Sequence, residues 1–299
     1  MNKSPLFHGL GVALITPFTS KGKVDEAALS KLVQWQMEEG VDFFCVLGTT
    51  AETPCLTEKE KRLIIDIARR ETAGRIPLLL GAGGNNTASV CNYLQKNDFT
   101  GIDGVLIVTP YYNKPTQRGL YAHYQAVSEA SPLPIVLYNV PGRTGVNLTA
   151  ETCLQIAEDF ENVIAVKEAS GNINQIKTII EQAPSGFSVL CGDDALTKEA
   201  ILAGAKGVIS VVGNAYPKSF AALSQAALSG NVEAATQIDN AIKAVYSPLF
   251  ADGNPAGVKA LLASRGVINN VLRLPLVPAS AATTAQLVAF DKSYQPSVG

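Results

Sequence analysis

The clearest candidate for chemistry is a lysine that directly follows an apolar stretch of the chain. Lys167 comes after residues 163–166, which read VIAV. If this stretch is a buried strand, the amine emerges among apolar groups, which disfavour the ammonium form and lower the pKa of the lysine. A neutral lysine amine attacks a carbonyl carbon and forms a Schiff base. The alternative role is structural, with the lysine paired to a neighbouring carboxylate.

A tyrosine and an arginine follow another apolar stretch. Tyr138 comes directly after residues 134–137, and a phenol with a lowered pKa relays the protons that imine formation requires. A tyrosine at a strand end also serves simply in packing. Arg143 lies in a loop rich in proline and glycine, residues 141–145. A guanidinium in such a loop is suited to a bidentate clamp on a substrate carboxylate.

Two adjacent threonines complete the polar set. Thr49 and Thr50 follow the apolar run 43–47 and Gly48. Their hydroxyl groups are able to pass protons to Tyr138 and to bind a substrate carboxylate. The structural alternative is that one of them caps a helix after the tight glycine turn.

Composition excludes several other chemistries. The five cysteines are scattered, and the only histidines are His8 and His123. This scarcity of histidine counts against catalysis by a Cys–His pair and against a histidine zinc site. No bound metal is therefore expected. A net charge of −2 without a basic cluster argues against nucleic acid or an anionic membrane as a partner. The N-terminal residues lack the apolar core of a signal peptide, so a cytoplasmic location is expected.

Eight short apolar runs rich in valine, isoleucine and leucine recur along the chain. They are residues 11–15, 43–47, 77–80, 104–108, 134–137, 163–166, 187–190 and 207–211. Their hydrophobicity is continuous rather than alternating, which is typical of strands covered on both faces. Amphipathic stretches lie between them, including a capping box formed by Thr57 and Glu60.

This alternation predicts an α/β protein, a (β/α)8 TIM barrel with a C-terminal helical extension. A doubly wound sheet is the rival fold, but no GxGxxG segment opens a first helix. After residue 212 the chain is rich in alanine and lacks further apolar strand runs. We therefore expect a catalytic barrel over residues 1–215 and a helical extension over residues 216–299. In such a barrel the loops after the strands build the active site.

Several motifs together resemble one family. They are GTTAE (48–52), VTPYYNKP (108–115), YNVPGRTG (138–145), VKEASGN (166–172), CGDD (191–194), GVISV (207–211) and NPAGVK (254–259). The chain resembles the dihydrodipicolinate synthase family, within the class I aldolase-like superfamily, from about residue 11 to residue 278. The resemblance implies a Schiff-base-forming lyase of lysine and diaminopimelate biosynthesis that condenses pyruvate with L-aspartate 4-semialdehyde.

The resemblance also implies site residues. Lys167 would form the covalent imine with pyruvate, and no other cofactor is implied. The remaining implied roles are a proton relay (Tyr138, Thr50 and Tyr112, the last lent across a dimer interface), binding of the pyruvate carboxylate (Thr49 and Thr50), binding of the semialdehyde carboxylate (Arg143) and a backbone lining (Gly192 and Ile209). A homotetramer built as a dimer of dimers is implied as well.

One departure from the family pattern concerns the threonine loop. The family commonly has glycine where this chain has Ala51. A methyl group is tolerated at this position provided that the backbone is not left-handed.

A regulatory pocket is implied by the same resemblance. Its positions match Thr53, Glu58, Lys61, Asn85, Ser89 and Tyr111. Lys61 and Ser89 replace groups that lysine-sensitive relatives use, so we expect weak or absent inhibition by lysine. The alternative is that Lys61 points to solvent and that moderate sensitivity remains.

Two other functions compete with this interpretation. A sister aldolase, such as an N-acetylneuraminate lyase or a keto-deoxy-sugar-acid aldolase, would need the same lysine and tyrosine. Arg143 favours the synthase. The small semialdehyde acid requires a cation to bind its carboxylate, whereas the pattern of the sialic acid lyases has an apolar residue at this position. A barrel that binds a ligand without catalysis would be expected to lose Lys167 or Tyr138.

Overall fold

The eight predicted strands form a closed parallel barrel in the computed structural model, which describes residues 5–295. The strands are β1 (Gly9–Ala13), β2 (Phe43–Val46), β3 (Leu78–Gly81), β4 (Gly104–Val108), β5 (Ile135–Asn139), β6 (Val163–Glu168), β7 (Ser188–Cys191) and β8 (Gly207–Ser210). Each strand pairs with the next along the chain, and β8 pairs with β1. The predicted barrel is therefore confirmed.

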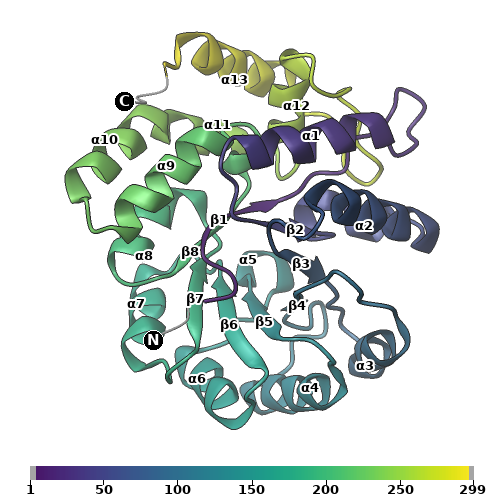
Figure 1. Cartoon of the computed structure of the whole chain (residues 1–299), viewed down its shortest axis with the longest axis vertical. Coiled ribbons are helices and arrows are strands. Elements are labelled where there is room, and N and C mark those ends of the chain that lie inside the picture. The colour runs from purple at the N-terminus through teal and green to yellow at the C-terminus, as the bar shows by residue number, and fades with distance from the viewer. Residues whose placement is uncertain (1–4, 296–299) are drawn as a thin grey trace.

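Helices surround the barrel and extend beyond it (Figure 1). They are α1 (Glu26–Glu38), α2 (Glu58–Thr72), α3 (Thr87–Lys96), α4 (Gln117–Ala130), α5 (Pro141–Thr144), α6 (Ala150–Asp159), α7 (Ile173–Gln182), α8 (Thr197–Leu202), α9 (Pro217–Leu228), α10 (Val232–Ile242), α11 (Tyr246–Phe250), α12 (Ala256–Ser264) and α13 (Ala281–Ser293). The capping box of Thr57 and Glu60 is present at the start of α2. None of the helices described between residues 5 and 295 has the length and apolarity needed to cross a membrane.

Apolar side chains fill the barrel on both faces of its sheet. Phe43, Leu79, Leu106 and Val136 belong to a buried cluster drawn from neighbouring strands, and a larger cluster lies between the sheet and the helices. Continuous apolar runs follow from this double covering. The register pairs Tyr138 with Lys167 across β5 and β6, so these two side chains share one face of the sheet.

The C-terminal helices form a separate layer beside the barrel. Figure 1 shows α12 and α13 near α1, while α9 packs against β1 and β8. By its packing α9 completes the ring of barrel helices, although it lies beyond residue 215. The proposed boundary at residues 215 and 216 therefore separates α9 from strands that it covers.

The first strand differs from its expected position. The apolar run 11–15 predicts a strand there, whereas β1 spans Gly9–Ala13. Leu14 and Ile15 are buried in the loop that follows the strand. Burial continues past the end of β1 because this part of the chain packs against the turn that follows β8, where Asn214 Oδ1 accepts from the amide of Ile15.

Candidate active site

The lysine and the tyrosine lie side by side at the ends of β6 and β5. Lys167 Nζ is 4.3 Å from the centroid of the Tyr138 ring. Lys167 is 6% exposed and Tyr138 is 7% exposed, so the amine lies over the tyrosine ring with both side chains largely buried. The strand register brings about this arrangement, because neighbouring positions on paired strands point to the same face.

The adjacent carboxylate does not serve as a partner of Lys167. Glu168 points to the opposite face of β6, where one oxygen accepts from Asn139 and Gln175 at 2.9 Å each. The other oxygen accepts from the backbone amide of Ser170 at 2.7 Å. Because Glu168 is held by these neutral donors, the structural ion pair that sequence alone allowed is not formed with it.

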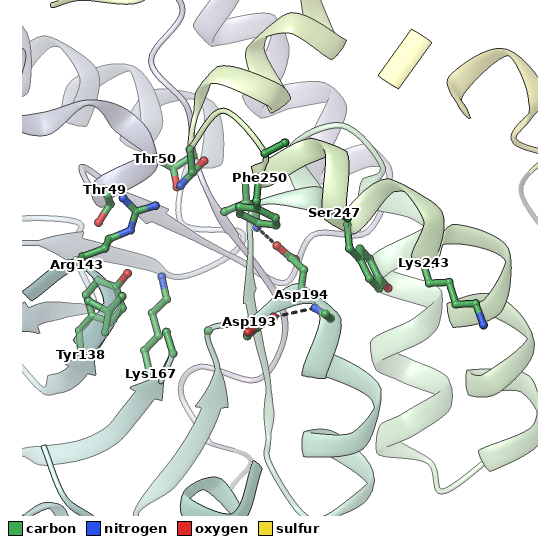
Figure 2. A pocket seen from close by; sticks show the side chains of 18 residues that line it. Thr49, Thr50, Tyr138, Arg143, Lys167, Asp193, Asp194, Lys243, Ser247 and Phe250 are labelled. Atoms are coloured by element: carbon green, nitrogen blue, oxygen red, sulfur yellow. Dashed lines mark hydrogen bonds between the residues drawn. The ribbon is translucent and has the colours of Figure 1, made fainter. Parts of the chain in front are cut away.

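A cavity of about 680 Å³ opens above these residues at the C-terminal ends of the strands. Its wall includes six residues predicted from sequence, namely Thr49, Thr50, Tyr138, Arg143, Lys167 and Gly192. Figure 2 shows Thr49, Arg143, Tyr138 and Lys167 at one side of this space, with Asp193 and Asp194 across from them. The predicted residues bring an amine, a phenol, a guanidinium and two hydroxyl groups to this cavity.

A short 3-10 turn, Thr49–Ala51, presents the two threonine hydroxyls. Leu47 and Glu52, which flank this turn, have positive φ values of 57° and 56°. Ala51 is not among the positive-φ residues, so the condition for tolerating its methyl group is met. The backbone oxygen of Ala51 accepts from Thr16 at 2.8 Å, which fixes the end of the turn.

A buried ion pair anchors this turn to the C-terminal extension. Lys259 on α12 donates to Glu52, and the side chains of both residues are fully buried. The backbone amide of Arg273 donates to the second oxygen of Glu52 at 2.9 Å. Burial lowers the pKa of Lys259 to about 8, although the charge of Glu52 opposes this shift.

Two further polar residues that line the cavity, Asn254 and Asp194, were not predicted as site residues from the sequence. Asn254 lies between α11 and α12, and its Nδ2 donates to Thr50 Oγ1 at 2.9 Å. Asp194 accepts from the Ser210 hydroxyl and from two backbone amides, and burial raises its pKa to about 6. Asn254 belongs to the motif at 254–259, and Asp194 to the motif at 191–194, yet neither pattern reveals that the side chain reaches the cavity.

Glycine is required at the end of β7. A Cβ atom at Gly192 would lie 2.6 Å from Ala169 Cβ and 3.1 Å from Lys167 Cε. The absent side chain therefore makes room for Lys167. Ile209 lies in the barrel interior and is not part of the cavity wall.

Tyr112 lies away from the cavity of its own chain. Its side chain is 88% exposed, and the backbone has a φ of 79°. A positive φ is uncommon for an aromatic residue and here turns the loop after β4 outward. Within one chain, Tyr112 is thus separate from Tyr138 and Thr50.

The six predicted regulatory residues come together in a second cavity of about 350 Å³. Lys61 lines this cavity and donates to Glu58 at 2.8 Å. A third cavity, of about 430 Å³, is lined by Thr53, Lys61 and Tyr111 as well as by Tyr138 and Arg143. The third cavity therefore shares lining residues both with the cavity of the predicted regulatory residues and with the cavity above Lys167.

Comparisons with known proteins agree with this geometry. The Dihydrodipicolinate synthetase family matches residues 6–292. The 4-hydroxy-tetrahydrodipicolinate synthase of Parabacteroides distasonis is 55% identical over 92% of this chain and 93% of its own, and that of Phocaeicola vulgatus is 53% identical over 94% and 95%. The crystal structure of dihydrodipicolinate synthase from Thermotoga maritima superposes with a TM-score of 0.94 at 43% identity, covering 97% of this chain and 99% of that one. The chain belongs to the dihydrodipicolinate synthetase family.

Proposed function

We propose that this chain condenses pyruvate with L-aspartate 4-semialdehyde through a Schiff base on Lys167, in lysine and diaminopimelate biosynthesis. The observation that carries the proposal is the buried amine of Lys167, 4.3 Å from the Tyr138 ring and without a carboxylate partner in Glu168. The names of the relatives and the presence of Arg143 favour this reaction over a sialic acid or sugar-acid aldolase.

The first half of the reaction joins pyruvate to the enzyme. The neutral amine of Lys167 attacks the ketone carbon, and the resulting carbinolamine loses water to give an imine. Tyr138 and Thr50 move the protons that these steps require, and Thr49 and Thr50 donate to the pyruvate carboxylate. The attack uses the lone pair of the amine, so Lys167 reacts in its unprotonated form.

The second half forms a carbon–carbon bond and a ring. The imine loses a proton from the pyruvate methyl group, and the resulting enamine carbon attacks the aldehyde of the second substrate. Arg143 binds the carboxylate of that substrate by paired hydrogen bonds. The aldehyde carbon becomes a hydroxyl-bearing centre, and the amino group of the second substrate then attacks the imine carbon. This closes a six-membered ring and releases Lys167 as an amine.

Tyr112 is proposed to complete the proton relay of a second copy of the chain. A single chain leaves this phenol exposed and away from its own cavity, whereas a partner in a homodimer would receive it. Pairs of such dimers would form the tetramer. The protein is proposed to act in the cytoplasm with no cofactor other than the imine.

Borohydride trapping tests the imine directly. Incubation with pyruvate and borohydride should add the reduced pyruvate mass to Lys167, and Lys167→Ala should give no adduct and less than a few per cent of normal turnover. Lys177→Ala is a matched control, because this lysine forms an exposed ion pair with Glu199. Coupled turnover of pyruvate with L-aspartate 4-semialdehyde, set beside cleavage of sialic acid, identifies the reaction. An adduct on another lysine, or none, would refute the proposal.

A further inference from the structure

The strand β6 contains one residue more than the matching part of β5. Val163 pairs with Ile135, but the next paired residue of β6 is Ala165, so Ile164 is passed over in the ladder. Val163 packs in the cluster between the sheet and the helices, whereas Ile164 and Ala165 both pack with the cluster inside the barrel. Two consecutive side chains on one face of a strand indicate a β-bulge, which redirects the side chains that follow.

This bulge decides which way Lys167 points. Side chains of a strand alternate between its two faces, so regular alternation from Val163 would turn Lys167 toward the helices. The extra residue reverses the alternation, and Figure 2 shows Lys167 beside Tyr138 at the cavity instead. A shift of one residue in register moves every following side chain to the other face. The interactions that hold the shifted register therefore hold the amine in the site.

One buried hydrogen bond on the outer face of the sheet fits only the shifted register. Asn139 pairs with Glu168 across the two strands, and its Nδ2 donates to Glu168 Oε2 at 2.9 Å. Without the bulge, Asn139 would lie opposite Lys167, and Glu168 would lie beyond the end of β5. The two side chains are 0% and 1% exposed, so a slip in register would leave buried polar groups without this bond.

Further hydrogen bonds tie this pair to its surroundings. Gln175 on α7 donates to the same oxygen of Glu168 at 2.9 Å. Asn139 Oδ1 accepts from the amide of Leu148 at 2.9 Å, which closes the loop that carries Arg143. Neutral donors thus hold a buried carboxylate here, and fixing a register is the best-attested use of such buried polar groups.

We propose that Asn139 and Glu168 form a register clamp, a pair of positioning residues that keeps β6 in the bulged register and holds Lys167 against Tyr138. Neither residue of the clamp lines the cavity above Lys167, so the pair acts on the reaction through the placement of the two strands. The inference rests on the proposed Schiff base and adds the feature that positions its amine.

Exchanging the two functional groups tests the register clamp. Asn139→Asp sets two carboxylates against each other and breaks the bond, while the new aspartate keeps an oxygen for the amide of Leu148. Adding Glu168→Gln restores the bond with donor and acceptor exchanged, and the double variant has the net charge of the unmodified protein. Glu168→Gln alone leaves one oxygen for donors that now use two, so it should give a smaller loss of the same kind. This single variant serves if Asn139→Asp does not fold.

The rate of imine formation is the informative measurement. At saturating pyruvate, borohydride quenching at successive times should show a rate about 10- to 100-fold lower in Asn139→Asp, because the amine is misplaced. The double variant should recover to within about threefold of the unmodified protein. The half-saturating pyruvate concentration should change less than about threefold, because the carboxylate is proposed to bind Thr49 and Thr50 on another loop. A merely structural role would lower the amount of folded, trappable protein and leave this rate unchanged.

Asn162→Asp is a matched control for the change from amide to carboxylate. Asn162 bonds to Ser128 just before β6 begins, so the substitution lies ahead of the bulge. Its imine rate should stay within about threefold of normal. An unchanged rate in Asn139→Asp would overturn the proposal, as would a double variant no faster than Asn139→Asp.

Hydrogen exchange separates failure of the register clamp from failure of the proposed function. Backbone amides of residues 135–139 and 163–168 should exchange faster in Asn139→Asp and recover in the double variant, whether or not the protein uses pyruvate. If the unmodified protein forms no adduct with pyruvate while exchange follows this pattern, the proposed function fails and the clamp stands. If it forms the adduct and neither rate nor exchange responds to Asn139→Asp, only the clamp fails.

Discussion

Lys167 and Arg143 differ in what surrounds them, and this difference fits the different roles proposed for them. Lys167 is buried at a strand end against the Tyr138 ring, whereas Arg143 lies on the short exposed helix α5. In the proposed reaction Lys167 is the nucleophile and attacks through the lone pair of its amine. An exposed guanidinium stays charged and binds carboxylates by geometry. The proposed covalent step and the proposed recognition step therefore fall on different residues.

Arg143→Leu should separate these two steps. Trapping of pyruvate on Lys167 should persist, whereas transition-state stabilisation with the semialdehyde should fall by about 2–4 kcal/mol, because one charged contact is lost. Steady-state kinetics over both substrates measures this effect. Arg118→Leu on α4 is a control, since this arginine is exposed and lies outside the cavity. Loss of pyruvate trapping in Arg143→Leu would assign the arginine to the first substrate.

Some residues of the candidate site can be predicted from the sequence more readily than others. Lys167 and Tyr138 directly follow apolar runs, so local pattern locates both at strand ends. Asn254 and Lys259 approach the threonine turn from about two hundred residues away. No local periodicity reports such a contact, because it depends on how the extension folds back over the barrel. Their motif was recognisable, but their partners were not.

At the scale of elements, a buried histidine joins two helices. His123 on α4 is 4% exposed, and its Nδ1 lies 2.9 Å from the Thr87 hydroxyl at the start of α3. Burial lowers the pKa of this histidine to about 4. The contact between α3 and α4 therefore favours neutral imidazole.

The free energy of unfolding should depend on the protonation of His123 between about pH 6.5 and pH 4. The unfolded chain binds a proton in this window and the folded chain does not, so stability falls as the pH falls. The expected loss is on the order of 2–3 kcal/mol by pH 4 relative to His123→Asn, which does not titrate. Urea unfolding at several pH values gives this difference. The raised pKa of Asp194 changes the free energy of unfolding in the opposite direction as the pH falls. This contribution is the same in both proteins, so it cancels when their free energies of unfolding are compared. Parallel curves for the two proteins would contradict the prediction.

Helices with an apolar stripe were predictable, and one without such a stripe was not. The helix α2 begins with a capping box and buries Ile64 and Ile67 on one face. By contrast, α13 buries only Thr283 and Leu287, and its apolar residues lie all around its axis. Its position depends on contacts with α11 and α12 rather than on a pattern of its own. Sequence therefore predicts a helical extension without assigning this helix.

At the scale of the whole molecule, the proposed relay requires more than one chain. Tyr112→Phe should lower turnover, because the relay loses a hydroxyl group, and should leave the sedimentation coefficient unchanged. The unmodified protein should sediment as a dimer or larger. Tyr121→Phe is a control, since Tyr121 lies on α4 and bonds to Asp159. A fully active monomer would show that Tyr112 is not shared between chains.

Inhibition by lysine should be weak. In the regulatory cavity Glu58 is already paired with Lys61, so an incoming ammonium meets a like charge and an occupied carboxylate. Lys61→Ala should increase sensitivity to lysine by about tenfold. Turnover measured against a lysine titration checks both statements. Half-inhibition of the unmodified protein below about one millimolar would contradict this account of the cavity.

The buried pair of Glu52 and Lys259 also bears on how the protein is made. A ribosome synthesises the threonine turn long before residue 259, and N-terminal segments begin to fold first. Until Lys259 arrives, Glu52 has no cation beside it, so burying its carboxylate in the native position is strongly unfavourable. Asn254 reaches Thr50 at the same late stage. A partly synthesised or truncated chain therefore lacks the contacts that hold the threonine turn, and with the proposed roles it should become active only once the last quarter of the chain has joined the barrel.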